Sequence, residues 1–201
     1  MGSFAGTNFF YKLNKLRLGR NMNEREYMIL GLLGPVTAIL FLVISIIFSP
    51  WFSFFNNALS DLGHSINSDV APLFNFGLLL SGLFMIIYSV TIFKNHAKYT
   101  SYFLLIAGLS LQLIATFDEV YRPLHFQVSV LFFITIGFTS IIYTIERKSV
   151  VAFVALIIGV VSWIIYGAGI YGMGIAVPET ISSMATFVWI ILSTLKIHFN
   201  K

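Results

Sequence analysis

Six apolar runs, each long enough to cross a membrane as a helix, make up most of this chain. About 20 consecutive apolar residues span the hydrocarbon core of a bilayer. The runs are continuously apolar, whereas the strands of a membrane barrel alternate in polarity and are about 10 residues long. The sequence therefore predicts an all-α fold, a polytopic six-helix transmembrane bundle, with spans at Met28–Phe48, Pro72–Phe93, Thr100–Phe117, His125–Ile145, Val150–Tyr171 and Glu179–Ile197.

The composition excludes several classes of protein. Of the 201 residues, 58% are hydrophobic and 10% are charged, whereas a soluble domain has about 25% charged residues. The chain contains no Cys. Disulfides, thiolate nucleophiles and Cys-ligated metal centres are therefore excluded.

The distribution of positive charge predicts the orientation in the membrane. Eleven of the twelve Lys and Arg residues lie on the side that holds both termini, and Arg122 alone lies on the other side. Because cytoplasmic loops carry an excess of Lys and Arg, we expect a multi-pass protein of the cell membrane with both termini cytoplasmic. The basic side predicts contact with anionic membrane lipids. No basic stripe of the kind that binds nucleic acid accompanies it, so no nucleic-acid partner is expected.

We divide the chain into three parts: a basic amphipathic cytoplasmic segment at residues 1–27, a six-helix membrane domain at 28–197 and a cytoplasmic tail at 198–201. In the first part, Phe9, Leu13 and Leu16 share one helical face beside several cations. This pattern suits a helix lying in the membrane interface. A partly ordered basic tail that only sets the orientation is the alternative.

Acidic and imidazole side chains gather on the opposite, extracytoplasmic side. Asp61 and His64 are three residues apart in the longest loop, while Asp118 ends the third span and His125 begins the fourth. A short connection makes the third and fourth helices antiparallel neighbours, which brings Asp118 close to His125. We expect these four side chains to meet in one pocket that opens to the outer leaflet. By contrast, His96 and His198 are expected to be solvated among the cytoplasmic cations.

The four residues Asp61, His64, Asp118 and His125 are the catalytic and metal-ligand candidates. Two carboxylates and two imidazoles suit a divalent metal such as Zn with an activated water. They equally suit a metal-free site in which Asp orients His and a serine, Ser60 or Ser65, attacks. A third interpretation is a hydrogen-bonded network that ties the outer loops together. The spacing matches no recognised metal signature, so the cofactor stays open.

Four further polar residues near this group are ligand-binding candidates. They are Ser60, Asn75, Glu119 and Arg122.

One stretch carries a resemblance to a known family. The run Asn57-Ala58-Leu59-Ser60-Asp61-Leu62-Gly63, with Asn75-Phe76-Gly77-Leu78 in the second span, resembles an uncharacterised archaeal and bacterial six-helix membrane family. The hallmark of that family, a domain of unknown function, is an N-x-L-S-D-L-G motif after the first helix. The family is distantly similar to the DRAM/Frag/Sfk group of eukaryotic membrane proteins. The resemblance extends over most of the chain and implies a role in membrane-lipid biology.

Two functional hypotheses follow. The first is a lipid-associated binding or scaffold protein with an extracytoplasmic polar site. The alternative is a hydrolase or transferase that acts on lipid at the outer leaflet, with or without a metal, so whether the protein is an enzyme is left open. A transporter is disfavoured because it requires ionisable residues at mid-membrane, where this chain has none. Membrane lipids are the expected partners, and both a homo-oligomer and a membrane-protein partner remain open.

Overall fold

The computed structural model describes residues 24–170, 172 and 174–199 of the chain. The predicted amphipathic segment at 1–27 lies outside these residues except for its last four. The described part is helical, without strands, and six of its helices are long and apolar enough to cross a membrane. These observations confirm the predicted all-α membrane bundle.

Six long helices and several short ones form the bundle. The first span is α2 (Glu24–Ile47). The second consists of α3 (Ala71–Tyr88), a π-helical segment η2 (Ser89–Phe93) and the short α4 (Lys94–His96). The remaining spans are α5 (Lys98–Thr116), α6 (Arg122–Arg147), α7 (Val150–Gly167) and α8 (Ala176–Phe199). Two 3₁₀ turns, η1 (Leu59–Gly63) and η3 (Glu119–Tyr121), lie in the connections.

Several helices begin earlier or end later than the apolar runs predict. Helix α2 begins at Glu24, within the expected amphipathic segment, and α8 continues to Phe199, within the expected tail. Helix α6 begins at Arg122, with Pro123 in its first turn, where a missing N–H costs no intrahelical bond. Hydropathy marks the stretch that lies in hydrocarbon, whereas the backbone hydrogen bonds of a helix continue through polar residues beyond it.

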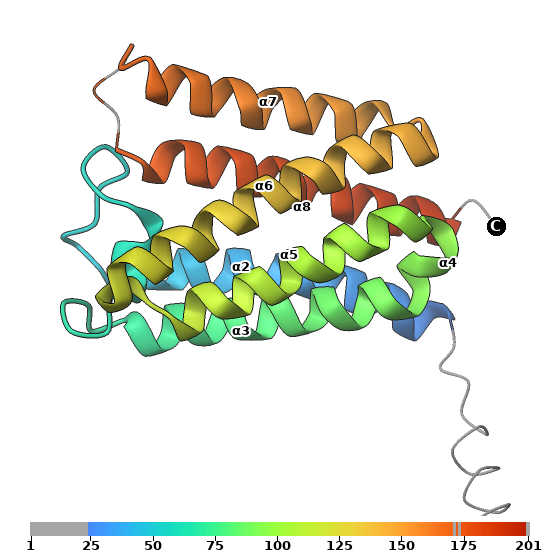
Figure 1. Ribbon diagram of the computed structural model, residues 1–201. Helices are drawn as coiled ribbons and strands as arrows, with labels where there is room; N and C mark the ends of the chain where they lie inside the picture. Colours follow the sequence, from blue (N-terminus) through green and yellow to red (C-terminus); the bar gives the residue numbers. More distant parts are fainter. Residues whose placement is uncertain (1–23, 171, 173, 200–201) are drawn as a thin grey trace, which may run out of the picture.

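The helices form a closed bundle with one outer member (Figure 1). Each long helix packs on the next along the chain, and α8 returns to α2. Helix α8 also contacts α6, so α7 packs on the outside, against α6 and α8. The side of α7 that faces away from the bundle is apolar and exposed, as Val154, Ile157 and Val161 show, and it therefore faces lipid in a membrane.

Small residues let the first helices approach closely. Ser81 of α3 is fully buried, and its Oγ donates to the carbonyl of Gly34 in α2 over 2.8 Å. A Cβ added at Gly82 would lie 2.6 Å from the carbonyl oxygen of Gly108 in α5. Close approach at small residues is the usual way in which membrane helices associate.

The two ends of the bundle differ in charge. We call the end that carries the long connection 48–70 the acidic end, because Asp61, Asp69, Asp118, Glu119 and Glu179 lie there. We call the opposite end, where α6 ends and α7 begins, the basic end. Its cations include Lys94, Lys98, Arg147, Lys148 and Lys196.

Candidate functional site

The connection 48–70 folds over the acidic end, with η1 packed against α3, α8 and η3 (Figure 1). Asp61 orders this turn from within. Its Oδ2 accepts hydrogen bonds from Asn57 Nδ2 (2.8 Å) and from the backbone N–H of Ala58 (3.0 Å). A carboxylate that accepts from the start of its own turn acts as a cap. Asp61 therefore stabilises the N-x-L-S-D-L-G segment itself.

Two glutamates attach this segment to the bundle. The backbone N–H of Leu59 donates to Oε2 of Glu179 in α8 over 2.8 Å, and Glu179 is buried. The hydroxyl of Ser60 donates to Oε2 of Glu119 in η3 over 2.9 Å. Successive residues of the turn are thus bound to different parts of the chain.

The end of the segment is held by burial and by α3. The side chain of Leu62 is fully buried. The carbonyl of Gly63 accepts from Asn75 Nδ2 over 2.8 Å, and a Cβ at Gly63 would lie 2.5 Å from Asn75 Oδ1. A residue larger than Gly does not fit there without a shift. We call the assembly of η1 with Asn75, Glu119 and Glu179 the polar cap.

The two histidines of this end bond locally. Nδ1 of His64 accepts from the backbone N–H groups of Ile66 and Asn67, each at 3.3 Å. Nδ1 of His125 lies 2.8 Å from the carbonyl of Phe117. Because a carbonyl only accepts, Nδ1 of His125 carries a proton, and its Nε2 lies 3.3 Å from Ser129 Oγ.

The four catalytic candidates are not joined into one polar group. Asp118 is buried, and its Oδ1 accepts from the backbone N–H of Val120 over 2.9 Å. Asp118 and His125 thus bond to the same connection between α5 and α6, as expected from adjacent helices, whereas Asp61 and His64 each bond within their own turn. In the described part of the chain, no group of three or more His, Asp and Glu side chains is arranged to hold a metal ion. A metal at these residues and their catalytic role both stay predictions.

The ligand-binding candidates mostly bond to the protein itself. Ser60 pairs with Glu119, and Asn75 holds Gly63. Arg122 is exposed at the start of α6. Their polar atoms support the third interpretation of the sequence, a network that ties the loops together.

Two residues that were not among the predicted site residues, Asn57 and Glu179, are central to the polar cap. Their signals in the sequence are the four-residue spacing of Asn57 from Asp61 and the position of Glu179 as the one acid in the last span.

The expectation that His96, at the basic end, is merely solvated is wrong, since its Nε2 lies 3.2 Å from Tyr143 Oη.

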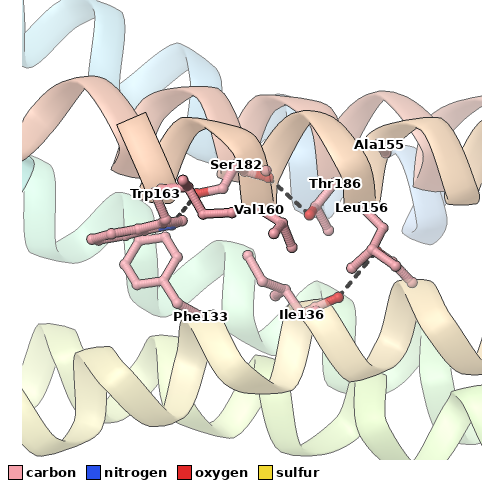
Figure 2. A pocket seen from close by; sticks show the side chains of 12 residues that line it. Phe133, Ile136, Ala155, Leu156, Val160, Trp163, Ser182 and Thr186 are labelled. Atoms are coloured by element: carbon pink, nitrogen blue, oxygen red, sulfur yellow. Dashed lines mark hydrogen bonds between the residues drawn. The ribbon is translucent and has the colours of Figure 1, made fainter. Parts of the chain in front are cut away.

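A cavity of about 320 Å³ lies between α6, α7 and α8 (Figure 2). We call it the lateral cavity. Its larger apolar lining residues are Phe133, Ile136, Leu156, Val160, Trp163 and Ile164.

The polar groups of the lateral cavity are satisfied by the protein. Ser140 Oγ donates to the carbonyl of Ile136 over 3.0 Å, and Thr186 Oγ1 donates to the carbonyl of Ser182 over 2.9 Å. Ser182 Oγ donates to Pro178 and accepts from Trp163 Nε1. Figure 2 shows such bonds as dashed lines between lining residues. The wall therefore presents mainly hydrocarbon.

Comparison with known proteins identifies a family for most of the chain. Residues 32–196 match the family described as "Protein of unknown function (DUF998)". No curated protein and no solved structure matches the chain. The distant similarity to the DRAM/Frag/Sfk group stays a prediction. Since the match extends over all six spans except the start of the first and the end of the last, the chain belongs to the DUF998 family.

Proposed function

We propose that this protein binds a membrane lipid and holds one of its acyl chains in the lateral cavity. The observation that carries the proposal is an apolar cavity between membrane-spanning helices. Its volume of about 320 Å³ falls in the range of ligand sites, about 300–1,000 Å³.

The lining supports an apolar occupant. The hydroxyls of Ser140, Ser182 and Thr186 donate to carbonyls of their own helices. A polar ligand would lose its hydration there without gaining partners, which is unfavourable. A hydrocarbon chain has no such cost.

The position of the cavity supports a membrane lipid as the source of the bound acyl chain. Val160 and Ile164 line the cavity and are 47% and 62% exposed, so the cavity opens at the outer side of α7. In a bilayer that side faces lipid, and the lining residues Phe133, Ile136 and Ser140 lie in the middle part of α6. The abundant apolar molecule at that depth is the lipid itself.

The polar cap has a supporting role in this proposal. Its acids and amides bond to one another and to the backbone. The cap fixes the connection 48–70 onto α8, and α8 forms one wall of the lateral cavity. The proposed function is therefore lipid binding by a rigid bundle.

The test is to fill the cavity. Gly137 lines it, and a Cβ at this position meets nothing within 4 Å. Gly137→Leu should therefore occupy the cavity without disturbing the backbone. Native mass spectrometry of protein extracted in mild detergent then counts retained lipid molecules.

The matched control is Gly167→Leu, at the end of α7, where a Cβ also meets nothing within 4 Å. We expect the unmodified protein and Gly167→Leu to retain a lipid that Gly137→Leu loses. Equal retention by all three proteins would overturn the proposal.

A further inference from the structure

A second cavity, of about 540 Å³, lies at the basic end, between the α6–α7 connection and the last turns of α8. We call it the basic cavity. Its polar lining residues include His96, Arg147, Lys148, Ser149, Ser193 and Lys196. We infer that the basic cavity binds the phosphate group of an anionic membrane lipid.

The cations come from separate parts of the chain. Arg147 is the last residue of α6, and Lys196 lies in the last turn of α8. Lys148 comes directly after Arg147 and is the C-cap residue of α6. Its φ of 49° is positive, a conformation that favours Gly over other residues. The fold thus brings three positive side chains to one cavity, where their mutual repulsion favours an anion.

Among the described residues that line the basic cavity, none is an Asp or a Glu. The nearest acid in sequence, Glu146, is occupied elsewhere. Its carboxylate accepts from the backbone N–H groups of Tyr99 and Thr100, each at 3.0 Å, and from Thr100 Oγ1 at 2.7 Å. Glu146 therefore caps the start of α5 and does not line the basic cavity.

Uncharged donors complete the lining. Ser149 Oγ accepts from the backbone N–H of Ala152 over 3.3 Å, which leaves the hydroxyl proton of Ser149 to donate. Val150 and Val151, which begin α7, also line the cavity. The first backbone N–H groups of a helix have no intrahelical partner and suit a phosphate oxygen.

The rim favours a lipid over a soluble phosphate. Val150, Val151 and Leu192 line the cavity and are 73%, 43% and 46% exposed. Apolar residues beside cations at the end of a membrane bundle match the level at which head groups meet acyl chains. The same three helices line the lateral cavity further along, but the phosphate site stands on its own lining and does not require the acyl-chain site.

The experiment titrates three probes against the full chain in neutral detergent and follows its melting temperature. The probes are dioctanoyl phosphatidic acid, dioctanoyl phosphatidylcholine and inorganic phosphate. The test variant is Arg147→Gln/Lys196→Gln. The control is Lys94→Gln/Lys98→Gln, which removes the same charge from exposed positions of the same end outside the cavity lining. Because Arg147 and Lys196 are also exposed, both variants should fold.

We expect phosphatidic acid to stabilise the protein more than either other probe. The test variant should weaken its apparent affinity by about tenfold or more, since each cation near a membrane surface contributes about 1 kcal/mol, and the control should have little effect. The single variant Lys148→Gln should also weaken the apparent affinity for phosphatidic acid.

Three results would overturn the inference. An equal loss of affinity for phosphatidic acid in both double variants would mean that the lipid is attracted to the basic end as a whole and not to the cavity. Equal affinity for inorganic phosphate means a site for the free ion, and equal affinity for phosphatidylcholine means that charge is not recognised. This test is independent of the test of the lateral cavity, because Gly137 lines the lateral cavity and is not among the residues that line the basic cavity.

Discussion

The backbone N–H of Leu59 donates to Oε2 of Glu179 over 2.8 Å and joins residues that are 120 positions apart. Glu179 is buried at the start of α8, so its carboxylate satisfies a backbone group that water reaches poorly. This bond attaches the N-x-L-S-D-L-G segment to the last span. It gives a structural reason for an acid in an otherwise apolar run.

Replacing Glu179 should loosen the polar cap. Glu179→Ala leaves the N–H of Leu59 without its acceptor, which should lower the free energy of unfolding by about 1–3 kcal/mol. Glu179→Gln keeps an acceptor oxygen and should lose less. Melting temperature in detergent and the rate of proteolysis within 48–58 measure the effect. Identical values for Ala, Gln and the unmodified protein would refute a role for this bond.

Asp61 should matter more than Asp69, although both are acids of the same connection. Asp61 Oδ2 accepts from Asn57 Nδ2 and from the N–H of Ala58, whereas Asp69 is exposed. Asp61→Ala should therefore cost about 1–3 kcal/mol of stability, and Asp69→Ala should be close to neutral. Thermal denaturation of the two variants side by side tests this, and equal melting temperatures would count against a cap centred on Asp61.

The contact between α3 and α5 should not tolerate an added methyl group. A Cβ at Gly82 would lie 2.6 Å from the carbonyl oxygen of Gly108 and 2.7 Å from Gln112 Cγ. Gly82→Ala should therefore destabilise the bundle by about 1–3 kcal/mol, as overpacked sites do.

The control for Gly82 is Gly137, in α6. A Cβ at Gly137 meets nothing within 4 Å, and Ala is a better helix former than Gly by up to about 1 kcal/mol. Gly137→Ala should be neutral or stabilising in the same melting assay. A larger loss of melting temperature in Gly137→Ala than in Gly82→Ala would contradict the close approach of α3 and α5 at Gly82.

The predicted orientation is open to a direct labelling test. Ser65 and Lys98 are exposed at opposite ends of the bundle, and the chain has no Cys of its own. A membrane-impermeant thiol reagent should label Ser65→Cys in intact cells and Lys98→Cys only after permeabilisation. The reverse pattern would invert the assignment of both ends.

The six spans could be predicted from the sequence because a bilayer selects for length and apolarity, and both are local properties. The prediction for α7 begins at the same residue, Val150, as the helix itself. The position of Asp118 and His125 on either side of one short connection also followed from local features, since such a connection makes adjacent helices antiparallel. The charge difference between the ends required only a count of Lys and Arg between the spans.

Only the tertiary structure decided which residues meet. Glu179 binds Leu59, and the cations of α6 and α8 share the basic cavity, because helices that are distant in sequence pack together. Hydropathy also does not separate core from lipid-facing positions. In α8, Trp189 is fully buried while Val188 is 51% exposed, although both are apolar. Lipid and protein interior are equally apolar, so packing, and not polarity, distinguishes the two faces of a membrane helix.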